Sequence, residues 1–313
     1  MIRLIKSFIQ SLAIIYFILI ISFHVLILRK ELLIVCDKYG RLGNRLFLFA
    51  QLIEFSRESG REIWMPGFHE YCSFFKTTEN SRFIRYPRGN FDIPNPFSGI
   101  VSFNAFNHIS RINEKINSEY LFENFVSYSP TDGNPFLKIN STQARCVLFN
   151  GFIFHQHFLD LHNSLPTIRT IFKPSSKFTH LIEDPIRALR KKSQLIVGVL
   201  VRQTDYREWN DGKSFFTSLE YAQILQRFCC SYSEENISFF IASDENQNEK
   251  IFENFVCIVR VGFPIENLYS LASCDLLIGP TSSYMGWAAL YGDVPSFTIQ
   301  SSDDSPTKED FIL

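Results

Sequence analysis

Short apolar runs alternate with amphipathic segments along most of the chain after residue 30. The first run, ELLIVCD at residues 31–37, is typical of a strand buried on both faces. A polar loop with two glycines follows it, and apolar residues then recur at helical spacing over 45–59 until Gly60. This order predicts a strand, a glycine loop and a helix, which together are a building unit of parallel sheets.

The same alternation continues through the second half of the chain, where the clearest strand-like run is LIVGVLV at residues 195–201. Further strands are predicted at 62–65, 146–154, 238–242, 257–261, 276–278 and 296–299, and helices at 219–228, 267–273 and 285–291. The sequence therefore predicts an α/β fold with parallel sheets covered by helices. Residues 66–140 show no clear periodicity. The polar segment 175–192 contains a predicted helix and is interpreted as a linker between two halves.

Residues 8–28 carry no charged side chain and consist mostly of Ile, Leu and Phe. At about 1.5 Å per residue, a helix of this length can just cross the roughly 30 Å core of a bilayer. Arg3 and Lys6 precede the segment, and Arg29 and Lys30 follow it without a small-residue cleavage site. We therefore expect a single-pass membrane anchor rather than a signal peptide or a core helix. The flanking charges do not decide on which side the large domain lies, because long domains can translocate regardless of them.

Composition narrows the function classes. The chain has 31 Lys and Arg against 32 Asp and Glu, which argues against a nucleic-acid-binding protein. Its seven cysteines include no Cys-x-x-Cys pair, and His155 and His157 have no carboxylate cluster beside them. We therefore expect neither a metal site nor a nucleic-acid partner.

Four polar segments follow predicted strands, where parallel sheets bind their ligands. They are residues 40–45, 202–206, 243–245 and 280–283. In the first, GRLGN, glycines between a strand and a helix would let backbone N–H groups approach an anion. A plain tight turn explains the same residues equally well.

The second segment places Arg202 directly after an apolar strand, where a guanidinium needs a partner. A phosphate would suit its planar donors. Asp205, three residues later, could orient Arg202 or act as a base. A structural ion pair between Arg202 and Asp205 is the competing interpretation, and the residues alone do not separate the two.

The other two segments also have two interpretations each. Asp244 at a strand end could contact a ribose hydroxyl or a base, or it could cap the next helix. Thr281, Ser282 and Ser283 at a predicted helix start could hold a phosphate near the positive end of the helix dipole. Ordinary N-capping by serine is the alternative.

Taken together, the four segments resemble the motifs of GDP-fucose-dependent fucosyltransferases, the superfamily of α-1,2-, α-1,6- and protein O-fucosyltransferases. GRLGN at 40–44 looks like the N-terminal motif, and VLVRQTDY at 199–206 is similar to H-x-R-R-G-D-Y. SDE at 243–245 resembles S-D-D, and CDLLIGPTSSYMGWAA at 274–289 resembles D-x-x-I-x-x-x-S-T-F-S-W-W-A-A. All four occur in family order and span most of the chain after the anchor.

The resemblance implies an α/β architecture of two Rossmann-like domains, GT-B-like, after an N-terminal transmembrane helix. The anchor would be residues 8–28, an N-terminal domain on the acceptor side 32–180, and a C-terminal nucleotide-sugar-binding domain 193–300. The implied activity is inverting transfer of fucose from GDP-fucose to a glycan or protein hydroxyl, without a metal or another cofactor. In a eukaryotic cell, the implied place is the lumenal face of the Golgi or endoplasmic reticulum membrane.

The resemblance also implies roles for individual residues. Arg202 would bind the pyrophosphate and stabilise the leaving GDP, and Asp205 would be a candidate base. Asn44 would lie near the reacting centre, in the same loop as Gly43. The remaining nucleotide contacts would come from Asp244, Thr281, Ser282 and Ser283.

Two departures from the family pattern keep other functions open. Leu200 stands where the family has His, and Gln203-Thr204 replaces Arg-Gly. A catalytically silent relative that binds a glycan or a nucleotide is therefore one alternative. A glycosyltransferase that uses a different nucleotide sugar is another.

Overall fold

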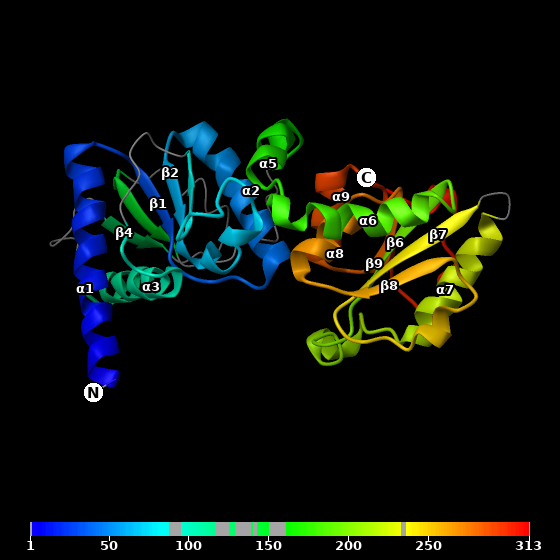
Figure 1. The fold of residues 1–313 in the computed structure, drawn as a ribbon. Helices are drawn as coiled ribbons and strands as arrows, with labels where there is room; N and C mark the ends of the chain where they lie inside the picture. Colours follow the sequence, from blue (N-terminus) through cyan, green and yellow to red (C-terminus); the bar gives the residue numbers. More distant parts are fainter. Residues whose placement is uncertain are drawn as a thin grey trace. The chain divides into compact units, whose positions relative to one another are not determined.

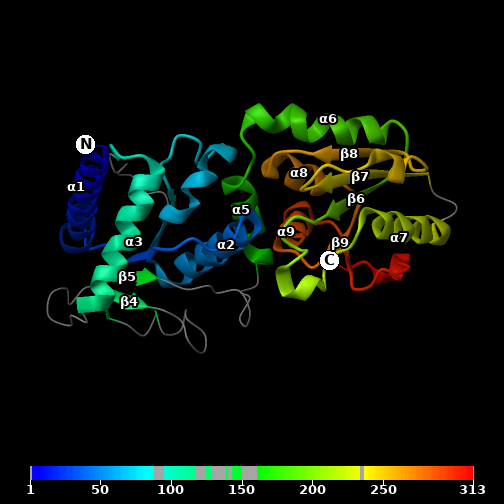
Figure 2. The ribbon, with the colours of Figure 1, turned by 90° about the horizontal axis from the view of Figure 1, so that it is seen from below.

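The computed structural model describes residues 2–87, 95–116, 125–128, 139, 143–149, 161–232 and 236–312. The chain divides into two compact units, Met1–Lys173 and Pro174–Leu313. Each unit contains a five-stranded sheet with helices against its faces (Figures 1 and 2). The predicted α/β class with parallel sheets is therefore confirmed, whereas the GT-B arrangement of the two units remains a prediction.

The first unit has the strand order β3-β2-β1-β5-β4, in which β3 alone runs antiparallel to its neighbour. Its strands are β1 (Leu32–Val35), β2 (Glu62–Met65), β3 (Ile84–Tyr86), β4 (Phe125–Tyr128) and β5 (Cys146–Phe149). Helix α2 (Leu42–Ser59) connects β1 to β2 on one face of the sheet, and α1 (Ile2–Ser22) and α3 (Gly99–Ile116) lie on the other (Figure 1). The short helix α5 (Leu165–Ile171) is the last element of the unit along the chain.

Helix α1 contributes directly to the core of the first unit. Ala13, Phe17, Ile21 and Val25, spaced four residues apart, have no exposed surface. Val25 belongs to η1 (Phe23–Ile27), a π-helical continuation of α1. These side chains pack on one face of the sheet with Leu32, Ile34, Trp64, Phe83 and Phe106. The ring centroids of Phe17 and Phe106 lie 4.5 Å apart.

The structure confirms an apolar N-terminal helix, Arg3–Ile27, that is long enough to cross a membrane by length and composition. The hydrophobic pattern did not predict that one of its faces covers a sheet. Burying a large aliphatic or aromatic side chain stabilises a fold by about 1.5–3 kcal/mol. The contacts of α1 are therefore a substantial part of the stability of the first unit.

The second unit is a parallel sheet with the strand order β10-β9-β6-β7-β8. Its strands are β6 (Leu195–Val201), β7 (Ile237–Ser243), β8 (Cys257–Val261), β9 (Leu276–Pro280) and β10 (Ser296–Ile299). Helix α7 (Ser218–Ser231) covers one face, and the other carries α6 (Thr179–Arg190), α8 (Pro264–Leu271) and α9 (Ser283–Gly292) (Figure 2). Val201 pairs in register with Ser243, and Val199 with Ile278. The loops after β6, β7 and β9 therefore leave the same edge of the sheet.

Local sequence sets where helices begin and end in both units. Helix α2 stops at Gly60, whose φ of 76° is left-handed and suits glycine. Helix α7 begins with a capping box, in which Thr217 Oγ1 accepts the N–H of Glu220 at 3.3 Å. Such caps replace hydrogen bonds that the first turn of a helix cannot make internally.

Most predicted elements are present, with small shifts at their ends. Helix α2 begins at Leu42 rather than residue 45, and α8 at Pro264 rather than residue 267. Residues 150–154 of the strand predicted at 146–154 lie outside the described residues. The helix predicted within residues 175–192 is present as α6, and it packs on the second unit, where Ser270 Oγ donates to the carbonyl of Ile182 at 2.9 Å.

The packing of α1 predicts that Phe17→Ala destabilises the chain by about 3–5 kcal/mol, because removing the buried ring leaves a cavity in the core. Denaturant unfolding of the purified full chain measures this. Ile15→Ala is the control, since Ile15 lies on the same helix but is 56% exposed. Equal stability of the two variants would contradict packing of α1 on the sheet.

Candidate functional site

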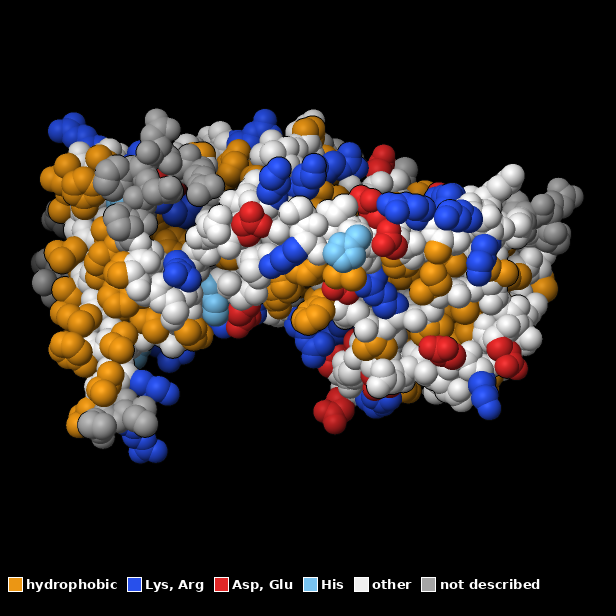
Figure 3. Space-filling view, in the orientation of Figure 1, with side chains coloured by type: hydrophobic (Ala, Val, Ile, Leu, Met, Phe, Trp, Pro, Cys, Tyr) orange, Lys and Arg blue, Asp and Glu red, His pale blue; other side chains and the backbone are white. Residues whose placement is uncertain are grey.

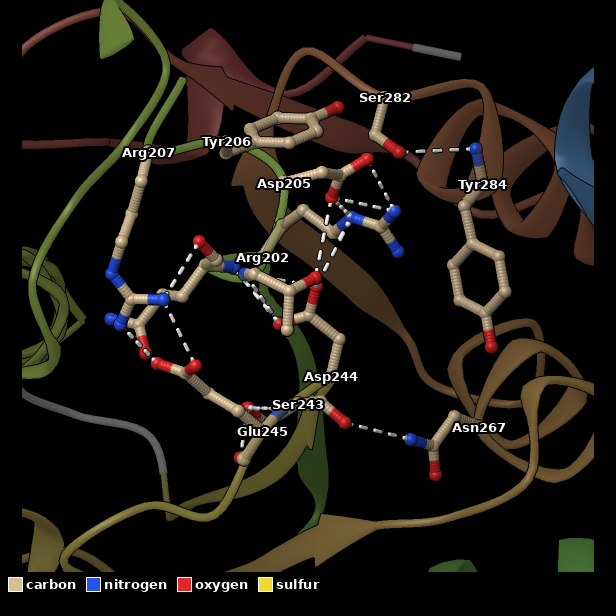
Figure 4. A network of polar contacts seen from close by, with 12 residues as sticks. Arg202, Asp205, Tyr206, Arg207, Ser243, Asp244, Glu245, Asn267, Ser282 and Tyr284 are labelled. Carbon is tan, nitrogen blue, oxygen red and sulfur yellow. Dashed lines mark hydrogen bonds and ion pairs between the residues drawn. The ribbon is translucent and has the colours of Figure 1, made fainter. Parts of the chain in front are cut away.

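Arg202 is the first residue after β6, and two carboxylates hold its guanidinium. Its Nε donates to Asp205 Oδ1 at 3.0 Å and its Nη2 to Asp205 Oδ2 at 3.1 Å. Asp244 Oδ2 lies 3.2 Å from the same Nε. Figure 4 shows Arg202 and Asp205 facing each other, with Asp244 beside them. The predicted ion pair with Asp205 is therefore present, and the Arg202 side chain is only 15% exposed.

Asp244, at the end of β7, fixes the loop that follows β6. Its Oδ1 accepts the backbone N–H of Gln203 at 2.9 Å, and its Oδ2 accepts the hydroxyl of Thr204 at 2.6 Å. The next helical turn is capped by Asn248 instead, whose side chain accepts the N–H of Lys250 at 3.3 Å. Asp244 thus positions Arg202 through backbone as well as charge, a task that the sequence did not suggest.

Tyr206 connects the loop after β6 to the loop after β9. Its hydroxyl donates to the carbonyl of Thr281 at 2.7 Å, and the residue is 8% exposed. Burial raises the pKa of the Tyr206 phenol above its usual value, so the phenol stays a proton donor at neutral pH. Tyr206 ends the VLVRQTDY motif, but its role in joining two loops was not predicted from the sequence.

Ser282 and Ser283 begin α9. Ser282 is the N-cap, and its Oγ accepts the backbone N–H of Tyr284 at 3.1 Å. The expected alternative of serine capping is therefore observed. Capping does not remove the helix dipole, so the N-terminus of α9 keeps its partial positive charge. Figure 4 shows Ser282, at this N-terminus, near Asp205 and Arg202.

A second ion pair lies beside the first. Arg207 Nη1 and Nη2 lie 3.0 and 2.5 Å from the two carboxylate oxygens of Glu245. Hydrogen bonding to Arg207 holds the pKa of the Glu245 carboxyl below its usual value. With Asp205 and Asp244, three carboxylates thus face two guanidiniums. An incoming phosphate has to compete with carboxylates for Arg202.

The two departures from the family pattern are built into the packing. Leu200 is 4% exposed, and a Cβ added at Gly279 would lie 2.9 Å from the Leu200 Cβ. Gln203 is 3% exposed, donates to the carbonyl of Phe216 at 2.8 Å and accepts from Gln247 Nε2 at 2.9 Å. Leu200 offers no polar group to a ligand, and the Gln203 amide already holds the loop.

In the first unit, the glycine loop after β1 folds tightly against the start of α2. Gly40 has a φ of 56°, and a Cβ there would lie 2.0 Å from Asn44 Nδ2, so only glycine fits. Gly43 and Asn44 lie in the first turn of α2, and Asn44 is half-buried. Gly40 therefore precedes the helix N-terminus as predicted, whereas Gly43 lies inside the helix because α2 begins at Leu42.

Arg45, which the sequence analysis did not single out, holds that loop. It is 5% exposed, and its Nη1 donates to Gly67 O at 2.6 Å and to Glu70 Oε2 at 2.7 Å. Its Nη2 donates to Gly40 O at 3.1 Å. Lys38 Nζ lies 2.5 Å from Glu70 Oε1. The available signal was an arginine inside an apolar helical pattern, where a charge needs partners.

The second unit thus gathers six predicted site residues at one edge of its sheet: Arg202, Asp205, Asp244, Thr281, Ser282 and Ser283. Gly43 and Asn44 belong to the first unit. Across the described ranges, no group of three His, Cys, Asp or Glu side chains could hold a metal ion. His155 and His157 lie outside those ranges.

Solved structures with a similar fold include fucosyltransferases, although no protein-family model and no curated protein sequence matches the chain. A mutant of Arabidopsis thaliana FUT1 in complex with GDP aligns with a TM-score of 0.55 at 10% identity, covering 90% of this chain and 73% of that one. The α-1,6-fucosyltransferase NodZ, found in Bradyrhizobium, was soaked with GDP-fucose. It aligns with a TM-score of 0.51 at 13% identity, covering 88% of this chain and 97% of that one. At such identities the likeness establishes the fold.

The network around Glu70 predicts a change in stability with pH. Burial raises the pKa of the Glu70 carboxyl, but hydrogen bonds and charge from Lys38 and Arg45 outweigh burial and bring it below the usual 4.5. A depressed folded-state pKa stabilises the fold above the unfolded-state value, and this stability is lost as pH falls through the folded value. Glu70→Gln should therefore lower stability at neutral pH and flatten its decline below about pH 4.5.

Denaturant unfolding at a series of pH values tests this prediction. Glu58→Gln, at an exposed position of α2, is the control and should keep the wild-type profile. If Glu70→Gln also follows the wild-type profile, Glu70 does not hold the loop through its charge.

Proposed function

We propose that the chain is a glycosyltransferase that transfers fucose from GDP-fucose to a hydroxyl of a glycan or protein, with inversion and without a metal. One observation carries the proposal. The guanidinium of Arg202 lies at the carboxyl edge of a parallel sheet, beside the start of α9, in a fold shared with FUT1 and NodZ. The solved relatives hold GDP or GDP-fucose, and the Arg202 guanidinium offers donors of the kind that bind a diphosphate once Asp205 is displaced.

The diphosphate would take the place that Asp205 occupies on Arg202. The Nε and Nη2 donors that now point at Asp205 form the planar pair that binds phosphate oxygens in bidentate fashion. Asp205 is 40% exposed, whereas Asp244 is 16% exposed. The exposed partner is therefore the one that can swing into solvent, while Asp244 keeps the loop in place.

The chemistry needs positive charge where GDP leaves. As the bond between the fucose anomeric carbon and the β-phosphate oxygen breaks, negative charge builds up on that phosphate. Arg202 and the positive end of α9 would stabilise this charge, with Ser282 and Ser283 as further donors. The acceptor hydroxyl attacks from the opposite face of the sugar and gives up its proton.

Asp205, once displaced from Arg202, is our candidate base for that proton. Asn44, in the first turn of α2, is the candidate from the first unit for a position near the reacting centre, with Gly43 in the same turn. Asp244 and Thr281 are further candidate nucleotide contacts. These assignments rest on the motif resemblance together with the positions described above.

A catalytically silent relative that binds a nucleotide or glycan is the second candidate. Two observations favour it: Leu200 replaces the family histidine with a buried aliphatic side chain, and Arg202 is already neutralised by carboxylates. The two candidates differ in turnover and not in fold.

We propose that the protein is located at a membrane, which α1 would contact. In a eukaryotic cell we propose the lumenal face of the endoplasmic reticulum or Golgi membrane. The apolar helix Arg3–Ile27 supports membrane attachment, whereas the compartment is proposed from the motif resemblance alone.

The proposed donor predicts a selective rise in melting temperature. A ligand that binds only the native state at a hundredfold excess over its Kd stabilises by about 2.7 kcal/mol. GDP should therefore raise the melting temperature by several degrees, and UDP and CMP should not. Arg202→Ala should abolish the shift, whereas Arg207→Ala, which removes a neighbouring arginine paired with Glu245, should keep it. An equal shift with UDP would reject the guanine nucleotide, and an unchanged shift in Arg202→Ala would reject the role of Arg202.

The competition between Asp205 and phosphate predicts opposite effects of Asp205→Asn on binding and on turnover. Removing a partly exposed ion pair worth up to about 1 kcal/mol should tighten GDP binding by up to roughly fivefold, measured by titration calorimetry. Loss of the base should lower kcat for fucose transfer by a factor on the order of a hundred or more. Weaker GDP binding by Asp205→Asn would mean that Asp205 positions Arg202 for the nucleotide instead of competing with it.

A further inference from the structure

Helix α1 with η1 has two apolar faces, of which the sheet of the first unit covers only one. The inner face is the line Ala13, Phe17, Ile21 and Val25, which is fully buried. The opposite face follows heptad-like spacing and is exposed along its whole length. It is formed by Ile5 (51% exposed), Phe8 (65%), Leu12 (44%), Ile15 (56%), Leu19 (63%), Phe23 (39%) and Leu26 (58%). We call these seven residues the outer stripe.

Figure 3 shows the result on the molecular surface, where hydrophobic side chains run along the edge formed by α1. Soluble proteins rarely expose a continuous apolar patch of this kind without a partner. The outer stripe therefore calls for an apolar occupant.

The inner line becomes polar where α1 extends beyond the sheet. Residues 3–9 are all exposed, so the first turns of α1 have no protein beside them. Continuing the inner line toward the N-terminus at helical spacing into these exposed turns gives Lys6 and Arg3. The inner side of α1 is thus apolar where the sheet covers it and polar in the first turns, which no protein covers. The outer side is apolar throughout. A helix with one apolar side along its whole length, and a second side covered partly by protein and partly by water, can lie in a membrane interface.

Charge at the two ends of the helix favours a lipid surface. Arg3 and Lys6 lie at one end, Arg29 and Lys30 at the other, and the first acidic residue of the chain is Glu31. This arrangement complements anionic lipid headgroups. A second copy of the helix is a poorer occupant, because coiled-coil seams are normally flanked by charged residues, and residues 7–28 contain no Lys, Arg, Asp or Glu.

We propose that α1 is an in-plane membrane anchor, with its outer stripe in the lipid interface and its inner face on the sheet of the first unit. This differs from the membrane-spanning orientation that hydropathy alone suggests. A helix that crossed the bilayer would have to withdraw Phe17, Ile21 and Val25 from their contacts with the sheet. The proposal does not depend on the proposed transferase activity.

The position of the two chain ends tests the in-plane orientation. The full chain is expressed with one epitope tag before Met1 and another after Leu313, and sealed membrane vesicles are treated with protease. An in-plane helix leaves both tags on the same side, so that both are digested or both are protected. One digested tag and one protected tag would show that α1 spans the membrane and would overturn the proposal.

Matched leucine variants test the outer stripe. Leu19→Glu places a charge in the stripe, and Leu219→Glu places one at a similarly exposed leucine of α7, 58% exposed against 63%. Leu19→Glu should lower binding of the purified full chain to phosphatidylcholine–phosphatidylserine vesicles by at least about tenfold, whereas Leu219→Glu should bind as wild type.

Equal vesicle binding by the two variants would overturn the role of the stripe. A wild-type chain that dimerises through α1 and ignores vesicles would also overturn it, in favour of a second copy. Ile15→Glu, at another exposed stripe position, repeats the test, and equal melting temperatures confirm that each variant is folded.

Discussion

The candidate site depends on one electrostatic constraint: a guanidinium that emerges at the end of a buried strand must be neutralised. Arg202 is 15% exposed, and an unpaired charge at such a position would be costly. The structure meets this need with Asp205 and Asp244, and the same Asp244 holds the backbone of the loop that carries Arg202. The parallel register of β6, β7 and β9 brings the three loops to one edge, so the partners are within reach without distortion.

That constraint also explains why the resting site can respond to an anion. Displacing a carboxylate from an arginine would be costly if both of its partners were buried, because the displaced charge would stay out of water. Here one of the two partners is 40% exposed and lies only three residues away, on the same loop. The pair therefore satisfies Arg202 when no ligand is present and leaves an exchange open when a diphosphate arrives. Binding and the release of Asp205 would be a single event.

Much of the fold was predictable because the two sheets are buried on both faces, and buried parallel strands read as continuous apolar runs. LIVGVLV at the buried strand β6 was placed to the residue, and so was CIVRV at β8, an edge strand that is only partly buried. Helix α3 was missed, although Ser102, Ala105, Phe106 and Ile109 form a buried helical stripe. Its Gly, Ser and Asn residues have low helix propensity and hid the period, and only packing against α1 and the sheet makes the helix stable.

The position of the candidate site was predictable, but the hydrogen bonds and ion pairs that join its residues were not. Strand ends followed by Arg202, Asp244 and Ser282 could be read directly, because ligand sites recur at such ends. The tasks of Asp244 and Arg45 depend on residues more than 20 positions away, including Gln203 for the first and Gly67 for the second. Likewise, hydropathy reports that α1 is apolar but cannot tell which of its faces packs on protein.

Hydrolysis of GDP-fucose without any acceptor tests the central claim most directly, because water can stand in for an unknown hydroxyl. Release of GDP and fucose is followed for the wild type, Arg202→Ala and Arg207→Ala. We expect slow catalytic release by the wild type, with fucose appearing in the opposite anomeric configuration from that in the donor. We also expect that Arg207→Ala retains this activity and that Arg202→Ala loses it. GDP binding without any release above the Arg202→Ala background would contradict a transferase and identify a silent relative.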